Sequence, residues 1–402
     1  MKKHWLIGLW VLTSLGCMGR ATVPSSRLLP EGARLVDLTY SFDEKTLYWP
    51  TSPSGFELKQ LSHGLTPGGF FYASNTLCTP EHGGTHLDAP IHFAEGKMTT
   101  DQLPLERLIA PAVVVDISAD AAGNPDALLQ PSHLASFEQE HGRIEPGTIV
   151  LVRSGWGRRW PDRKQYLGDD TPGDASKLHF PGISREAAEA LVERRVAAVG
   201  IDTASVDHGP SKDFIAHQVL MKADIPAFEN VAALEQLPLE RLIAPAVVID
   251  MSVDAASNPD ALLQPSHLDA FEKKHGRIEP GTIVLVRTGW GKRWPDRKQY
   301  LGDDTPGDAS KLHFPGLSEE ASKALVERKA AAVGIDTASI DHGPSKDFIA
   351  HQVLMKADIP AFENVAALDQ VPPRGALIIA LPMKIRGGSG GPLRIVAVLP
   401  PA

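Results

Sequence analysis

Three histidines and one aspartate lie close together in the chain: His82, His86, Asp88 and His92. Imidazole nitrogens and a carboxylate, with no thiolate among them, suit zinc, manganese or iron(II) in a catalytic site. Neighbouring glycines and a proline disfavour a helix here and favour an irregular turn or a short extended stretch. In an extended backbone the side chains of His86, Asp88 and His92 would point the same way, because even numbers of residues separate them. The segment therefore predicts a metal site.

A second set of candidate ligands lies far downstream. His217 and Glu229 occur in one segment, and the same segment occurs again with His351 and Glu363. Taken alone, either histidine would be expected to have a structural role. Either pair becomes a plausible source of distal ligands when it completes a site that begins at His82. The sequence thus offers two candidates for the same task.

The repetition extends well beyond these residues. Residues 102–235 recur as 236–369 without a gap, and about 18 of the 134 positions differ. Repeats of 20–50 residues would indicate a solenoid, whereas a period this long indicates a duplicated block of a domain. Without one copy 268 residues remain, which is the size of one large domain. We therefore predict a single domain over residues 33–402 that carries the duplicated block.

Either copy could complete that domain while the other is looped out. We favour His217 and Glu229, because the first block can pack as soon as it is made. The surplus block would expose unpaired strand edges and apolar faces unless it pairs with another chain. His351 and Glu363 remain the alternative ligands.

The composition is that of a globular protein, with 43% hydrophobic and 22% charged residues. A formal net charge of −9 leaves no basic excess to neutralise phosphates, so nucleic acid is not an expected partner. Two cysteines cannot form a cysteine-based zinc site.

The first residues have the pattern of an export signal. In residues 1–20, two lysines precede an apolar stretch that is too short for a comfortable membrane span, and small residues and Cys17 follow it. We expect an exported protein, either periplasmic or anchored as a lipoprotein through Cys17, with no transmembrane segment in the mature chain. A cytoplasmic location is the alternative.

Short β-branched runs and a capped helix predict an α/β fold. Strands are expected at 112–116, 148–152 and 197–201, and again in the tail at 376–380 and 393–399. A helix is expected from Arg185, with Ser184 as its N-cap. Tryptophans follow the second of these strands in each copy, and we expect them to be packing or loop residues (Trp156, Trp160, Trp290 and Trp294).

The stretch from His82 to Phe93 has the pattern H-x-G-T-H-x-D-x-P-x-H-F. It resembles the signature of the cyclase-type metal-dependent hydrolases, which include bacterial kynurenine formamidases and isatin hydrolases. Further matching segments cover essentially the whole mature chain apart from the extra block: Asp37–Thr39, Gly200–Asp207, the segment of His217 and Glu229, and Leu381–Ile385.

The resemblance implies a swivelling β/β/α fold and a homo-oligomer, either a dimer or a tetramer. It also implies one or two divalent ions, Zn²⁺ or Mn²⁺, bound through the positions that match the family's ligands: His82, His86, Asp88, His217 and Glu229. His92 falls where the family has its general acid/base. Trp49 lies near a position at which related formamidases stack an aromatic substrate.

The predicted reaction is hydrolysis of a small, aryl-linked amide, either N-formyl or cyclic, as in an arylformamidase. Metal-bound hydroxide would attack the carbonyl, and His92 would carry the proton to the leaving nitrogen. An esterase or lactonase of the same fold is one alternative. A non-catalytic exported binding or assembly protein, in which the duplication has disrupted the site, is another.

Overall fold

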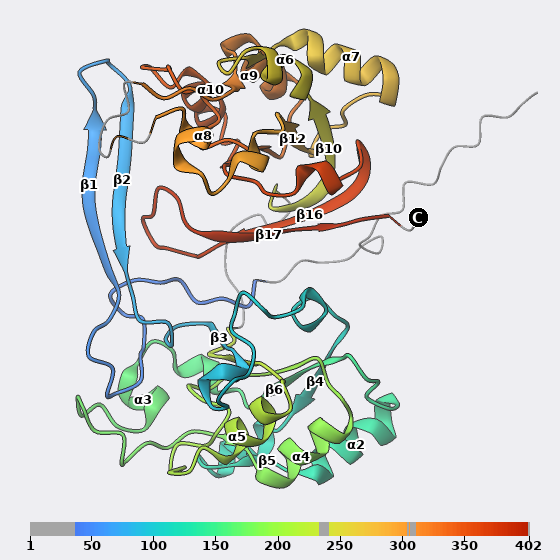
Figure 1. The fold of residues 1–402 in the computed structure, drawn as a ribbon. Coiled ribbons are helices and arrows are strands. Elements are labelled where there is room, and N and C mark those ends of the chain that lie inside the picture. Colours follow the sequence, from blue (N-terminus) through green and yellow to red (C-terminus); the bar gives the residue numbers. More distant parts are fainter. Residues whose placement is uncertain (1–36, 233–240, 304, 306–310, 401–402) are drawn as a thin grey trace, which may run out of the picture.

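The structure is a computed structural model that describes residues 37–232, 241–303, 305 and 311–400. Its sheets and helices form two α/β lobes, drawn one above the other in Figure 1. Lobe one contains the N-terminal segment and the first copy of the block, and lobe two contains the second copy and the tail. The expected α/β class is confirmed. The predicted export signal and Cys17 lie outside the described residues.

Lobe one is built on a five-stranded sheet in the order β3-β9-β8-β6-β4. Four of its strands are parallel, and β3 runs antiparallel to β9. Leu134, Leu191 and Leu220 from three helices belong to the same buried core as the strand residues. The elements are β3 (His86–Asp88), β4 (Ala112–Asp116), β6 (Ile149–Arg153), β8 (Ala198–Ile201), β9 (Ala227–Glu229), α2 (Pro131–His141), α4 (Arg185–Glu193) and α5 (Ile215–Lys222).

Lobe two repeats the four parallel strands in the same relative order and adds the two tail strands at one edge, giving β15-β14-β12-β10-β16-β17. The tail strands run antiparallel to their neighbours. The elements are β10 (Ile243–Asp250), β12 (Ile283–Arg287), β14 (Ala332–Ile335), β15 (Ala361–Phe362), β16 (Arg374–Pro382), β17 (Leu393–Val398), α7 (Pro265–His275), α9 (Glu319–Glu327) and α10 (Ile349–Lys356).

Short elements complete each lobe. They are η1 (Pro90–His92), η2 (Leu105–Arg107), α1 (Ser118–Gly123), β5 (Leu128–Leu129), η3 (Trp156–Arg159), α3 (Arg163–Leu167), β7 (Gly182–Ile183), α6 (Ser252–Ser257), β11 (Leu262–Leu263), η5 (Trp290–Arg293), α8 (Arg297–Leu301), β13 (Gly316–Leu317) and η6 (Leu368–Gln370). Within the parts of the chain that the structure covers, no helix has the length and apolar character that a bilayer crossing requires.

Each lobe has an edge strand whose counterpart in the other lobe is paired with a further strand. In lobe two β10 pairs with β16, whereas β4, its counterpart in lobe one, pairs only with β6 among the described strands. Conversely, β9 pairs with β3, but its counterpart β15 pairs only with β14 in the described chain. Val114 on β4 is consequently 48% exposed, while Val248 at the same place on β10 is 4% exposed.

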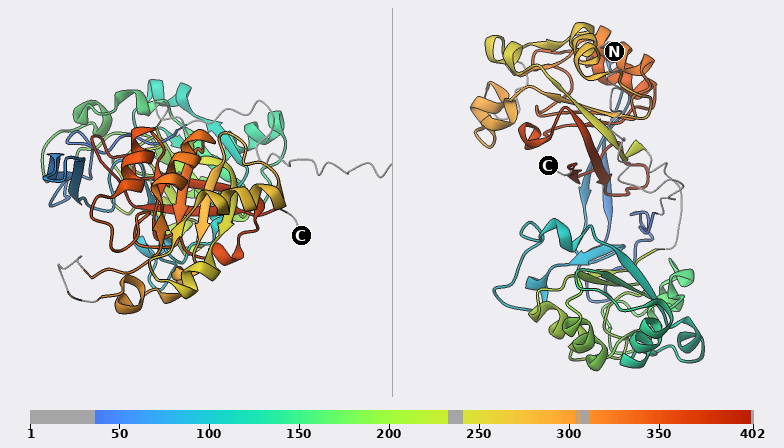
Figure 2. Two further views of the ribbon diagram at one scale, coloured as in Figure 1. Left: turned by 90° about the horizontal axis from the view of Figure 1, so that it is seen from above. Right: turned by 90° about the vertical axis from the view of Figure 1, so that its right-hand side faces the viewer.

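Two features connect the lobes, besides hydrogen bonds from Arg394 of β17 to the carbonyls of Thr100 and Leu103. A long hairpin of β1 (Glu57–Leu65) and β2 (Phe71–Cys78) runs alongside both of them (Figures 1 and 2), and Phe70 at its tip packs on Phe348 of lobe two with ring centroids 6.1 Å apart. The tail also meets the N-terminal segment. Residues 384–386 exchange backbone hydrogen bonds with Phe42, and Lys384 forms an ion pair of 2.8 Å with Asp37. We call this second contact the clasp.

The two copies of the block therefore form separate sheets with separate cores. Strand edges without a partner among the described strands are present in both lobes, and they include those of β4 and β15. Whether residues 33–402 fold as one cooperative domain stays a prediction.

Candidate metal centre

Strand β3 brings the N-terminal motif to the edge of the first sheet. His86 pairs with Glu229 of β9 across the antiparallel ladder, and Asp88 pairs with Ala227. Because side chains alternate along a strand, His86 and Asp88 share one face and Leu87 lies on the other. The two predicted ligands from β3 therefore lie on the same side of the sheet edge.

A tight turn before β3 sets the direction of its entry. Gly84 has a φ of +57°, and its N–H donates to the carbonyl of Leu47 over 3.0 Å. A side chain at Gly83 would overlap the ring of Tyr48, and one at Gly84 would lie 2.9 Å from the ring of Phe42. Glycine is required at both positions because the backbone passes directly against aromatic rings.

The extended stretch ends earlier than predicted. β3 stops at Asp88, and Pro90 begins the 3₁₀ helix η1, which ends at His92. Proline at the start of a helical turn fits its fixed φ. The expectation that His92 follows the strand alternation is therefore wrong. The turn instead stacks the His92 ring on that of His82, with centroids 3.9 Å apart.

The distal ligands come from α5 and β9 of the first copy. His217 lies on α5, and its Nε2 is 3.1 Å from Oδ2 of Asp88 and 3.1 Å from Oε1 of Glu229. Its Nδ1 lies 2.6 Å from Oδ2 of Asp207, which also accepts the backbone N–H of His217. A carboxylate on one ring nitrogen fixes the direction of the other. Asp207 thus aims His217 at the centre.

Sequence reasoning did not single out Asp207 for this role. The residue stands in the matching stretch Gly200–Asp207, so a signal was present. Its function depends on where α5 starts, because Asp207 also accepts the N–H of Ala216 in the first turn of that helix. That placement is tertiary and leaves no local pattern.

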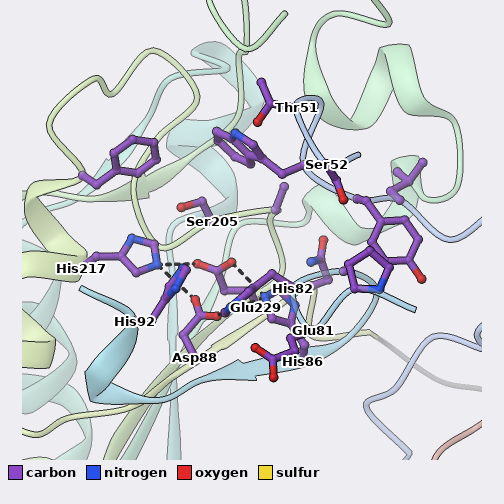
Figure 3. Close-up of a pocket in the computed structure, with 18 of the residues that line it drawn as sticks. Thr51, Ser52, Glu81, His82, His86, Asp88, His92, Ser205, His217 and Glu229 are labelled. Carbon is purple, nitrogen blue, oxygen red and sulfur yellow. Dashed lines mark hydrogen bonds and ion pairs between the residues drawn. The ribbon is translucent and has the colours of Figure 1, made fainter. Parts of the chain in front are cut away.

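Five predicted ligands meet in two overlapping groups (Figure 3). His82, His86 and Asp88 form one group, and Asp88 is shared with the second. In each group the candidate ligand atoms lie within 4.8 Å of one another. The second group consists of Asp88, His217 and Glu229. Asp88 can therefore contribute one oxygen to each.

The donor set fits a divalent cation. Nε2 of His86 is buried and makes no hydrogen bond, although it lies 3.2 Å from Oδ1 of Asp88 and 3.6 Å from Oε2 of Glu229. A buried polar atom without a partner is costly and normally has a reason. Here a cation held between the imidazole and the two carboxylates would satisfy all three groups.

The charges in this buried cluster shift one another strongly. Burial alone would lower the pKa of His86, but Asp88 and Glu229 raise it to about 9. Burial raises the pKa of Glu229, and the adjacent Asp88 carboxylate raises it further. Burial alone would raise the pKa of Asp88, but contacts with His217 and His82 hold it well below its usual range. Burial would lower the pKa of His217 as well, but Asp207, Asp88 and Glu229 raise it well above its usual value, so carboxylates and imidazoles in this cluster stabilise one another's charged forms.

A pocket of about 390 Å³ opens over these residues. Trp49, Phe93 and Phe214 line it, with the Trp49 and Phe214 rings edge to face at 5.9 Å. His92 also lines it, and burial together with the neighbouring histidines lowers the pKa of His92 to about 4. The pocket thus combines an aromatic wall with a neutral imidazole beside the candidate ligands.

The alternative ligands lie elsewhere, in lobe two. His351 is paired with Asp341 and lies 3.3 Å from Glu363, which reproduces the geometry around His217. His351 and Glu363 are about one third exposed, with side-chain exposures of 33% and 31%. Every group of three possible ligands found among the described residues contains Asp88. The second copy therefore has half of the arrangement and no counterpart of the β3 motif.

Comparisons with known proteins agree on one relationship. A family model described as "Putative cyclase" matches residues 36–208 and 213–342. An isatin hydrolase of Roseibium aggregatum is 36% identical over 172 residues, 42% of this chain and 64% of that protein. A kynurenine formamidase of Salinibacter ruber is 28% identical over 199 residues, 49% of this chain and 82% of that protein. This chain thus spans slightly less than two thirds of the isatin hydrolase.

The chain was also compared with solved structures. Isatin hydrolase A from Labrenzia aggregata is 33% identical, and the match covers 51% of this chain and 83% of that one with a TM-score of 0.45.

Proposed function

Because the chain belongs to the cyclase family, we propose that it is a metal-dependent hydrolase of a small amide. One observation carries the proposal: a buried imidazole nitrogen of His86 without a hydrogen bond faces two carboxylates at the floor of a pocket. The finer assignment is an aryl-linked amide, N-formyl or cyclic. Relatives named isatin hydrolase and kynurenine formamidase support it.

The metal would be held by side chains of lobe one. His82, His86 and Asp88 offer one set of donors, and Asp88 with His217 and Glu229 offers another. We propose Zn²⁺ or Mn²⁺ at one or both of these places, since nitrogen and carboxylate donors suit either ion. When bound, such an ion lowers the pKa of a water ligand and polarises the substrate carbonyl.

The remaining chemistry falls to His92. Its imidazole stacks on His82 and lies against the pocket, but it belongs to neither candidate ligand group. It is therefore free to take a proton from the attacking water and give it to the leaving nitrogen, while the buried ligands keep their positions.

The pocket wall supports an aromatic substrate. Trp49, Phe93 and Phe214 present rings to the space above the candidate ligands. An aryl group packed among them would gain area burial and edge-to-face contacts, and this would hold its amide carbon over the centre. Trp49 is accordingly our proposed substrate-binding residue.

The test compares the same substitution in the two copies. We expect the purified protein to retain about one or two equivalents of zinc or manganese after dialysis, because the complete donor sets found among the described residues all lie in lobe one. His217→Ala should lose bound metal and hydrolysis of aryl formamides and cyclic amides. The matched variant His351→Ala should keep both. A protein that cannot be loaded with metal, or a loss of activity confined to His351→Ala, would refute the proposal.

A further inference from the structure

Tyr40 fills a socket in lobe one. Its ring stacks on Trp160 with centroids 4.1 Å apart and an interplanar angle of 6°. Its hydroxyl donates to the carbonyl of Gly157 over 2.9 Å. The absence of a side chain at Gly157 makes room for this contact, since a Cβ there would lie 2.8 Å from the Tyr40 hydroxyl. We call this arrangement of Gly157 and Trp160 the phenol socket.

The second copy contains the same socket, already in position. Trp294 meets Tyr300 edge to face at 5.4 Å, as Trp160 meets Tyr166 at 5.4 Å. The buried indole of Trp290 donates to the carbonyl of Tyr300 over 2.7 Å, and its counterpart Trp156 does the same with Tyr166. The socket therefore keeps its shape without an occupant.

In lobe two this socket is open. Tyr40 lies outside the duplicated block and occurs once, so lobe two has no equivalent of it. Trp294 is 65% exposed, and the three atoms nearest to a Cβ built at Gly291 all belong to Asp336, at 3.6 Å or more. A pocket of about 350 Å³, lined by Gly291 and Asp336 among others, adjoins it. Trp294 is thus an exposed loop residue, whereas its copy Trp160 packs against Tyr40, and both agree with the expectation of packing or loop residues.

We propose that the socket formed by Gly291 and Trp294 binds a para-hydroxyphenyl group. The ring would stack on the exposed face of Trp294, and the hydroxyl would donate to the carbonyl of Gly291, as Tyr40 does at the identical residues of lobe one. Little reorganisation is needed, which favours binding because the ordering cost is already met by the fold. The ligand is a free phenol or a tyrosine side chain of a peptide segment.

The first test measures how many phenols bind. We would titrate the full chain with p-cresol by calorimetry and expect a dissociation constant of about 1 mM at this site. Trp294→Ala should remove one bound equivalent, whatever binds at the metal pocket. Tyr40→Ala should add one, because it opens the socket of lobe one. Trp294 is mostly exposed, so its replacement is expected to leave the fold intact.

Toluene tests the hydroxyl. It can stack but cannot donate, so it should bind to the Trp294 site about threefold to tenfold more weakly than p-cresol. A capped peptide of residues 37–43 tests the source of the ligand. Binding at least tenfold tighter than p-cresol assigns the socket to a tyrosine in an extended segment, and equal binding assigns it to a small phenol.

Equal p-cresol stoichiometry in the wild type and Trp294→Ala would overturn the proposal, as would equal affinity for toluene. Neither outcome depends on metal content or hydrolysis, so this proposal and the proposed function can fail separately.

Discussion

Asp88 is the residue on which the candidate centre depends most. It is buried, lies between His82, His86 and His217, and is common to both possible ligand groups. Its neighbour across the centre, Glu229, is buried as well and also accepts the N–H of Val206 over 2.7 Å. Two carboxylates held this close in a protein interior repel each other strongly unless positive charge separates them. Positive charge therefore stabilises the centre, whether it comes from the imidazoles of His86 and His217, whose pKa values are raised, or from a bound cation.

Asp207 should act through His217. The substitution Asp207→Asn keeps a hydrogen-bond acceptor for the first turn of α5 but removes the negative charge that orients the imidazole of His217. We expect metal affinity to fall by about 10–100-fold. Competition with a chelator measures this. The matched variant Asp341→Asn alters the same pair in lobe two and should leave metal affinity unchanged; an equal fall in both would exclude the assigned role.

His92 should matter for turnover and not for metal retention. In His92→Ala the proton carrier is lost, and we expect kcat to fall by about 10²–10⁴-fold. Elemental analysis of the same preparation should give an unchanged metal content, because His92 belongs to neither ligand group. Parallel loss of metal and turnover would instead make His92 a ligand.

At the scale of elements, the site depends on one short strand pairing. β3 contributes only three residues, yet its ladder with β9 places His86 against Glu229. The glycine turn before it is fixed from outside by the rings of Tyr48 and Phe42. The precision of the centre therefore comes from packing around β3 more than from β3 itself.

Gly84→Ala tests this dependence. A Cβ in a backbone with φ near +57° and 2.9 Å from the Phe42 ring costs about 1–3 kcal/mol and displaces the start of β3. We expect a lower melting temperature and weaker metal binding. Gly123→Ala is the control, since a Cβ there meets nothing within 4 Å. Wild-type metal affinity in Gly84→Ala would show that the turn does not set the centre.

Local sequence patterns predicted most elements of the fold. The strand at 112–116 coincides with β4, the strand at 148–152 is shifted by one residue in β6, and Ser184 caps α4 as expected. These features depend on apolar runs and caps, which are local. The even spacing of His86, Asp88 and His92 does not show where the extended stretch ends, because spacing in sequence is the same in a strand and in the 3₁₀ turn that begins at Pro90.

Local sequence patterns cannot show which of the two copies supplies the distal ligands. His217 and His351 stand in identical segments, so no propensity can distinguish them. The difference arises from strand β3, which pairs with β9 and leaves β15 without such a partner in the described chain. For the same reason the sequence could not tell that Trp160 is covered by Tyr40 while Trp294 is open.

At the scale of the whole molecule, the chain has one tail for two equivalent sheet edges. β16 pairs with the edge of β10, whereas the matching edge of β4 has no partner among the described strands, and Val114 on β4 is exposed where Val248 on β10 is buried. An apolar edge strand is a site for pairing with another chain. We propose that the chain forms homo-oligomers and that β4 contributes to the contact between copies.

Val114→Lys tests this contact. A lysine at the centre of an exposed edge strand opposes pairing by its charge, so we expect the variant to sediment as a monomer where the wild type does not. Val253→Lys is the matched control, because Val253 is 81% exposed on α6 of lobe two and should not affect assembly. A monomeric wild type, or an oligomeric Val114→Lys, would exclude β4 as the interface.

The clasp has a consequence for how the molecule opens. Asp37 and Lys384 are 347 positions apart in the sequence. Their ion pair closes a chain loop that includes both lobes. The clasp contains few residues, whereas each lobe has a core of its own. Contacts of this kind open in native-state hydrogen exchange far more often than core strands do. The backbone amides of Phe42 and Arg386 should therefore exchange together and early, while those of β8 and β14 remain protected, so that the clasp opens while both lobes stay folded.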